Sequence, residues 1–192
     1  MRTRVCITID TEFSIAGAFS HATRVPVAAP LVWCNVDGRS EGLGFMLDTF
    51  QHYGVRATFF VETVQRYYFR HDPMAPIARR IHDAGHEVQL HTHPCWALFE
   101  HPDWWERSRG MRGRDDFHGM PVAQSVRLIE QGIATFREWG LPRPLAFRRE
   151  DLPRLRLVER AVPLRDHERA DGVADEIRKR ADFRHEAIDA ED

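Results

Sequence analysis

Short apolar stretches alternate with longer amphipathic ones along the chain as far as residue 148. Four stretches have the alternating or continuous apolar pattern of β-strands, and they cover residues 4–10, 56–62, 87–93 and 144–148. Three stretches between them place apolar residues at helical spacing and are followed by glycine, and they cover residues 42–53, 73–84 and 121–139. Strands therefore alternate with helices, which predicts parallel βα units and an α/β fold.

The same periodicity predicts which side chains reach the core. In the first strand Val5, Ile7 and Ile9 share one face, and we expect a buried strand that ends at Asp10. In the last helix the predicted core stripe consists of Val122, Val126, Ile129, Ile133 and Phe136. Two segments without clear periodicity are predicted to be long loops, of a length that often serves as a lid or binding segment: residues 13–40 and 94–120.

The composition excludes several classes of protein. With 27 basic and 29 acidic residues the formal net charge is −2, so we expect no nucleic-acid partner. Three scattered cysteines suit neither a disulfide framework nor a CxxC zinc site, which favours a reducing compartment. Because there is also no membrane-span or signal-peptide pattern, we expect a cytoplasmic protein without a membrane span.

The composition changes abruptly after residue 148. From residue 149 onward 23 of 44 residues are charged, and Phe183 is the only aromatic residue. We therefore divide the chain into a domain over residues 1–148 and an anomalous charged tail over residues 149–192. Two explanations stay open for the tail: a frameshift of the gene near residues 148–150, or a genuine solvated helical extension.

Two of the predicted strands end in side chains that bind metal ions. Asp10 and Glu12 close the first strand, and His91 and His93 close the third. Residues i and i+2 of a strand project from one face, and parallel strands end at one sheet edge. The pattern thus predicts a two-histidine plus carboxylate site for a divalent metal such as zinc, with open positions for water and substrate. The alternatives are a turn or helix cap for the acidic pair and a hydrogen-bonded polar pair for the histidines.

Three sequence motifs carry a resemblance to a known family. The segments TIDTEFS, RATFFVE and GHEVQLHTHPCW, in this order, resemble the polysaccharide deacetylase family (NodB homology, carbohydrate esterase family four), and most closely a subgroup associated with lipopolysaccharide biosynthesis. The likeness covers roughly residues 3 to 148. It implies a partial distorted (β/α) barrel, a divalent metal that is often zinc, and removal of acetyl groups from an amino sugar or polysaccharide precursor.

The resemblance also implies metal ligands. His91 matches the first histidine ligand of the family. Glu12 lies near the position of its carboxylate ligand and Asp10 is the other expected carboxylate, although the family usually has two adjacent aspartates where this chain has Asp-x-Glu. The common second histidine falls four residues after the first, where this chain has Cys95, so His93 is the expected second ligand. Cys95 stays open as a zinc ligand or as a small packed residue.

Asp10 and Arg148 are the catalytic residues that the resemblance implies. Asp10 would be the general base that deprotonates the attacking water, and Arg148 would orient it, although the RRED that follows AFR departs from the glycine-rich continuation of the family. No later segment resembles the family's acid-histidine motif. A truncated non-catalytic remnant that binds metal therefore stays open, as does a metal-dependent amidohydrolase that acts on a small cyclic amide.

Three tryptophans are candidates for stacking on a carbohydrate substrate. Trp96 and Trp104 lie in the second long loop, and Trp33 lies in the first. Indole rings stack on sugar faces, but they pack in cores and interfaces as readily. Both interpretations stay open on the sequence.

Overall fold

The computed structural model of the chain describes residues 5–109, 115 and 117–149. Apart from Arg149, the predicted charged tail lies outside these residues. The frameshift and the helical extension therefore stay predictions.

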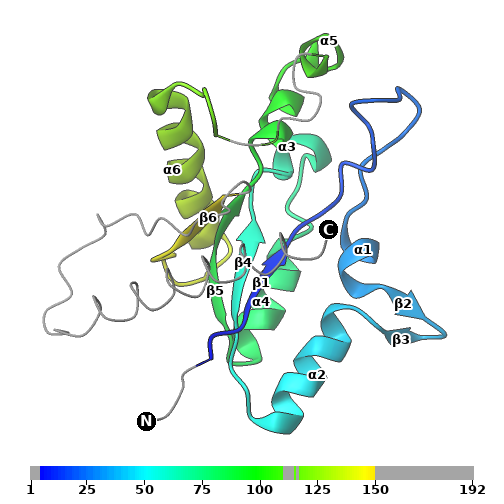
Figure 1. Cartoon of the computed structure of the whole chain (residues 1–192), viewed down its shortest axis with the longest axis vertical. Coiled ribbons are helices and arrows are strands. Elements are labelled where there is room, and N and C mark those ends of the chain that lie inside the picture. The colour runs from blue at the N-terminus through cyan, green and yellow to red at the C-terminus, as the bar shows by residue number, and fades with distance from the viewer. Residues whose placement is uncertain (1–4, 110–114, 116, 150–192) are drawn as a thin grey trace, which may run out of the picture. The chain divides into compact units, whose positions relative to one another are not determined.

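A parallel four-stranded sheet organises the described residues (Figure 1). Its strands, in spatial order, are β1 (Thr8–Thr11), β4 (Thr58–Glu62), β5 (Glu87–Thr92) and β6 (Phe147–Arg149). The segments between consecutive strands contain α2 (Leu43–Tyr53), α3 (Arg66–Phe69), α4 (Ala75–Asp83) and α6 (Val122–Glu138), besides the shorter elements described below. The predicted α/β class is confirmed, and the arrangement is consistent with part of a (β/α) barrel.

Both segments predicted to be loops contain short elements of regular structure. The first holds α1 (Ala29–Trp33) and a hairpin of β2 (Asn35–Val36) and β3 (Arg39–Ser40), and the second holds the 3₁₀ helix η1 (Pro94–Glu100) and α5 (Trp104–Ser108). The hairpin had a sequence signal. Asp37 and Gly38 form its two-residue turn with φ of 49° and 79°, and Asp-Gly is a favoured pair for a turn with two positive φ angles.

The first strand is shorter and more exposed than predicted. It begins at Thr8, Val5 is 82% exposed, and Ile7 and Ile9 are only partly buried. β1 is exposed because it is an edge strand: in the described sheet it pairs with β4 alone, and no strand covers its other edge. The expectation of a buried strand was therefore wrong.

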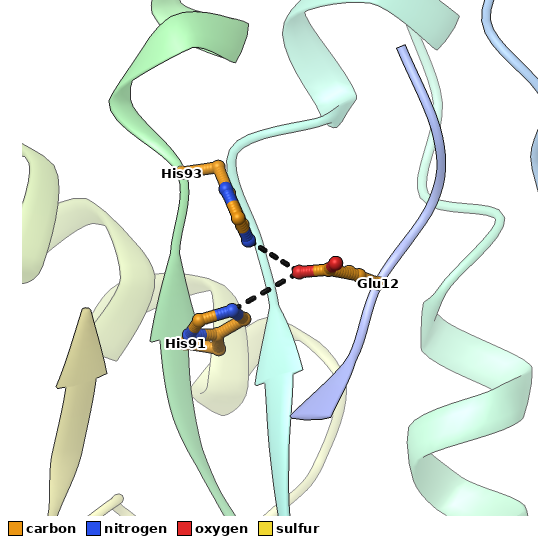
Figure 2. Close-up of side chains that lie close together, drawn as sticks. All are labelled: Glu12, His91 and His93. Atoms are coloured by element: carbon orange, nitrogen blue, oxygen red, sulfur yellow. Dashed lines mark hydrogen bonds and ion pairs between the residues drawn. The ribbon is translucent and has the colours of Figure 1, made fainter. Parts of the chain in front are cut away.

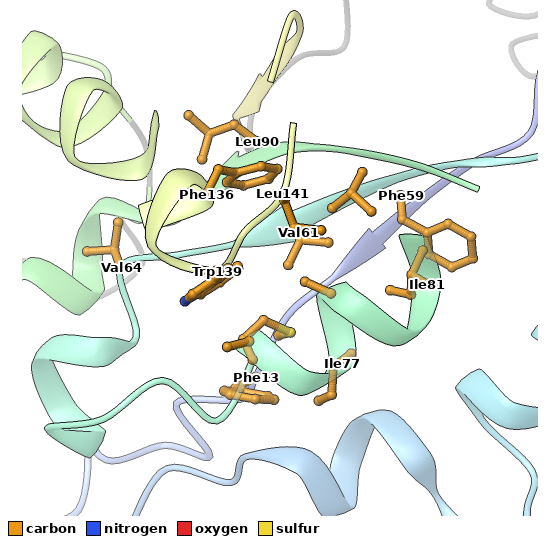
Figure 3. Packing of buried hydrophobic residues seen from close by; sticks show 14 of the residues in the cluster. Phe13, Phe59, Val61, Val64, Ile77, Ile81, Leu90, Phe136, Trp139 and Leu141 are labelled. Carbon is orange, nitrogen blue, oxygen red and sulfur yellow. The ribbon is translucent and has the colours of Figure 1, made fainter. Parts of the chain in front are cut away.

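The hydrophobic core lies on one face of the sheet (Figure 3). Phe59 and Val61 of β4 and Leu90 of β5 project from this face and are 0–1% exposed. Ile77 and Ile81 of α4 pack into the same cluster and are equally buried, as the helical periodicity predicts.

The buried face of α6 differs from the predicted stripe. Val122 and Val126 are 79% and 46% exposed, Ile129 and Ile133 are partly buried, and of the predicted stripe Phe136 alone is fully buried. The positions that face the core are Leu128, Gly132, Thr135 and Phe136. A Cβ atom on Gly132 would lie 2.6 Å from Leu90 Cδ1, so the missing side chain lets the helix approach β5 closely. Hydrophobicity alone could not reveal a contact that depends on the absence of a side chain.

The opposite face of the sheet carries polar side chains at its carboxyl end. The register pairs Asp10 with Phe60 and Glu62 with His91, and His91 pairs in turn with Arg148. Since strand side chains alternate between faces, these residues project from the face opposite the core. The fold thus gathers ionisable side chains from four strands on one surface.

Candidate metal and catalytic site

Glu12, His91 and His93 meet at the carboxyl ends of β1 and β5 (Figure 2). His91 Nε2 lies 3.1 Å from Glu12 Oε2, and His93 Nε2 forms a second hydrogen bond to the same oxygen. One ligand atom from each residue lies within 4.8 Å of the others. The sequence predicted that these three residues would come together, and the structure places them so.

The donor atoms suit a divalent metal ion. Zinc ligands lie about 2.0–2.1 Å from the ion, so neighbouring donors of a tetrahedral site are roughly 3.4 Å apart. Two imidazoles and one carboxylate are the ligand set of open zinc sites that keep a position for water or substrate. The three side chains therefore form a possible histidine and glutamate metal site.

The electrostatics of the cluster also favour a cation. Burial alone would raise the pKa of Glu12, but hydrogen bonds from His91 and His93 outweigh it and lower the pKa to about 2. Burial would lower the pKa of His93, but the hydrogen bonds to Asp115 and Glu12 and the charge of Glu62 raise it to about 11. The carboxylates that favour the protonated imidazoles would equally favour a divalent ion in place of the Nε2 protons.

Each histidine has a second partner that fixes its ring. His91 Nδ1 donates to the carbonyl oxygen of Arg148 at 2.8 Å, and His93 Nδ1 donates to Asp115 Oδ2 at 2.6 Å. Nε2 of each ring donates to Glu12 in turn, so a metal ion would take the place of the Nε2 proton while Nδ1 kept its partner. Both Nε2 atoms already lie toward Glu12.

Glu62 is part of this site, and the sequence interpretation missed it. Its side chain is 0% exposed, and burial raises its pKa to about 7 against the charges of His93 and His91. Its oxygens accept backbone N–H groups of Thr63, Val64 and His93. A signal was present, because Glu62 ends the predicted strand 56–62 beside the strand of the histidines.

Asp115 also escaped the sequence interpretation. Besides His93 Nδ1, its carboxylate accepts the backbone N–H of Cys95, at 3.0 Å. It lies in a segment without periodicity, so no register argument could bring it to the sheet edge.

Cys95 lies outside the metal-capable group. The thiol is buried, and burial together with the charge of Asp115 raises its pKa well above the ordinary value. Cys95 is packed within the hydrophobic core cluster, which fits the interpretation as a small packed residue.

Asp10 is not brought into the metal-capable group of the described residues either. It precedes Glu12 by two positions on the same strand face, a rise of about 6.6 Å. Its Oδ1 accepts a 2.7 Å hydrogen bond from Arg148 Nη1, and the guanidinium carbon of Arg148 lies 4.1 Å from the centre of the Phe60 ring. The expected metal contact of Asp10 is thus replaced by an ion pair with Arg148.

The three tryptophans differ in their surroundings. Trp96 is 1% exposed and packs against Tyr68, Phe69 and Phe99, so packing describes it and no ring face is free for a sugar. Trp104 and Trp33 are partly buried against the core cluster. Their contact with a carbohydrate stays a prediction.

Part of the chain, including the two histidines, is similar to a known protein family. Residues 31–125 match the family model described as polysaccharide deacetylase. The matched segment contains β4, β5, His91 and His93, whereas Asp10, Glu12 and Arg148 lie outside it. No curated protein and no solved structure matches the chain.

Among the helices of the described residues, none has the length and apolar character needed to span a bilayer. The helices instead alternate with the strands of a parallel sheet, which is the α/β arrangement expected of a deacetylase-type fold. The match supports a polysaccharide deacetylase-like domain over residues 31–125, the segment that contains β4 and β5.

Proposed function

We propose that the chain is a metal-dependent hydrolase that removes an acetyl group from an amino sugar or polysaccharide precursor. The observation that carries the proposal is the position of the Glu12, His91 and His93 group on the same sheet face as the Asp10–Arg148 ion pair. A metal site beside a held carboxylate is the arrangement that hydrolysis of an amide or ester requires. The family match supports the reaction class.

Glu12, His91 and His93 would hold the ion. A divalent metal held there supplies a Lewis acid for the acetyl carbonyl and lowers the pKa of water. Asp10 accepts the proton of the attacking water, and its ion pair with Arg148 holds the carboxylate in place. The guanidinium is itself held against the Phe60 ring.

We also propose a substrate, a compartment and a metal for this hydrolase. An acylated precursor of a surface glycan such as lipopolysaccharide, processed in the cytoplasm with zinc as the metal, agrees with the composition and with the motif resemblance. The carbohydrate would reach the polar sheet face from the side of the loops that follow β1 and β5.

The proposal is tested by metal content and acetate release on the purified 192-residue chain. Acetylated chitooligosaccharides and nucleotide-linked amino sugars are the substrates, and a small cyclic amide is the comparison. We expect bound metal and acetate release from the sugars. Asp10→Asn should lose several orders of magnitude in rate, while Asp48→Asn on α2 should not.

Other outcomes would replace the proposal. Metal binding without acetate release would indicate a non-catalytic remnant. Turnover of the cyclic amide alone would indicate an amidohydrolase. Acetate release that survives complete metal removal would contradict metal dependence.

A further inference from the structure

His93 lies at a position that the sheet does not fix. β5 ends at Thr92, and His93 has an extended backbone with φ of −100° and ψ of 106° ahead of η1. A residue beyond the last ladder pair receives no register from the neighbouring strand. Its side chain can serve as a precise ligand only if other groups hold it.

Glu62 holds the backbone of His93. One carboxylate oxygen accepts the N–H groups of Thr63 and Val64, at 2.7 and 2.6 Å, and the other accepts the N–H of His93. The side chain is fully buried. This carboxyl group therefore ties the end of β4 to the residue that follows β5.

Asp115 holds the ring of His93. Its Oδ2 accepts from His93 Nδ1 at 2.6 Å, while its Oδ1 accepts from the backbone N–H of Cys95 at 3.0 Å. The two oxygens thus fix the ring relative to the first residues of η1. The equivalent nitrogen of His91 meets a neutral carbonyl instead, so the two histidines have outer partners of different charge.

We infer that Asp115 is a positioning residue that makes His93 a metal ligand, with Glu62 fixing the backbone of the same histidine. The inference rests on the proposed function only in taking the Glu12, His91 and His93 group as the metal site. Outer partners of this kind fix the tautomer of the ring and raise its basicity, and their loss usually costs 10- to 100-fold in metal affinity. A carboxylate in this role compensates for the missing strand pairing at His93.

Zinc affinity of the full chain, measured by competition with a chelating indicator, tests the inference. Asp115→Asn should bind zinc about 10- to 100-fold more weakly than the unsubstituted chain. Asp103→Asn is the matched control, because it removes the same charge from an exposed residue that pairs with Arg107. Its zinc affinity should not change.

A double variant separates positioning from simple electrostatics. If Asp115 acts through His93, then His93→Ala and His93→Ala/Asp115→Asn should bind zinc equally. A further loss in the double variant would show that Asp115 acts on the metal directly, and would overturn the inference. Equal zinc affinity of Asp115→Asn and the unsubstituted chain would also overturn it.

The inference can also be tested on the unsubstituted chain, in case the Asp115 and His93 variants do not fold. Long-range ¹H–¹⁵N spectra of the zinc-loaded chain should show His93 protonated at Nδ1 and ligated through Nε2. The opposite tautomer, or an unligated His93, would overturn the inference. Zinc binding with the expected tautomer but without acetate release would leave the inference standing while refuting the proposed reaction.

Discussion

Arg148 donates a 2.7 Å hydrogen bond to Asp10 across 138 positions of the chain. The two residues stand on opposite edge strands of the described sheet, β6 and β1. The ring of Phe60, on β4, lies beneath the guanidinium. The ion pair therefore spans the polar face, and it exists only when the strands of the sheet are assembled in register.

Substitution of Arg148 should impair the reaction more than the fold. Arg148→Ala leaves Asp10 without its partner, and we expect the rate of acetate release to fall about 100-fold or more, because base catalysis contributes roughly 10²–10⁴. The measurement is kcat on an acetylated chitooligosaccharide. Arg143→Ala is the control, because it removes the same charged side chain from an exposed position that lines a surface pocket with α6 residues. An unchanged kcat for Arg148→Ala would exclude the proposed role.

Removal of the two imidazoles should abolish metal binding. We expect the His91→Ala/His93→Ala variant to purify without stoichiometric zinc, because one carboxylate alone binds zinc weakly. Elemental analysis after dialysis measures the content. His52→Ala, on the exposed face of α2, should retain the full content. Full stoichiometry in the double variant would place the metal elsewhere.

His86 should make the fold sensitive to mild acid. Its Nδ1 accepts the N–H of Ala57 at 3.2 Å, and its ring packs against Phe50 and Phe59. Burial lowers the pKa of His86, and the charge of Arg56 lowers it further. The unfolded chain therefore binds more protons just below pH 6.5, and the contribution of His86 to the free energy of unfolding is lost as the pH falls from 6.5 toward its folded pKa.

Urea unfolding at several pH values measures this effect. The loss should not exceed about 1.4 kcal/mol per pH unit. His86→Asn keeps an acceptor for the Ala57 N–H but cannot titrate, so its profile between pH 5 and 6.5 should be flatter. His52→Asn should follow the unsubstituted chain. Parallel profiles for all three proteins would contradict the assignment.

Gly132 should tolerate no side chain. In Gly132→Ala the new Cβ would lie 2.6 Å from Leu90 Cδ1 and 3.0 Å from Thr63 Oγ1. Overpacking of a core costs about 1–3 kcal/mol, while alanine gains up to about 1 kcal/mol in helix propensity. We expect a net loss of up to about 2 kcal/mol in the free energy of unfolding, measured in urea. Gln124→Ala, on the exposed side of α6, should be neutral or slightly stabilising.

Periodicity predicted β5 and α4 correctly, but it did not predict the exposure of β1 or the core face of α6, which tertiary contacts set. The strand with His91 and the helix with Ile77 and Ile81 follow patterns that burial imposes directly. The register of parallel strands explains why Glu12 could be placed beside the histidines, and the same argument extends to Glu62. Asp115 reaches His93 through an irregular segment, where neither period nor register constrains position.

β6 is a three-residue strand at one edge of the described sheet, yet it contacts both the metal-capable group and the proposed base. Its backbone oxygen at Arg148 holds the ring of His91, and its side chain at the same position holds Asp10. Fraying of this one short strand would free a metal ligand and the base together. The slowest rearrangement of the site should thus coincide with the opening of the β5–β6 amide ladder, which hydrogen exchange reports residue by residue.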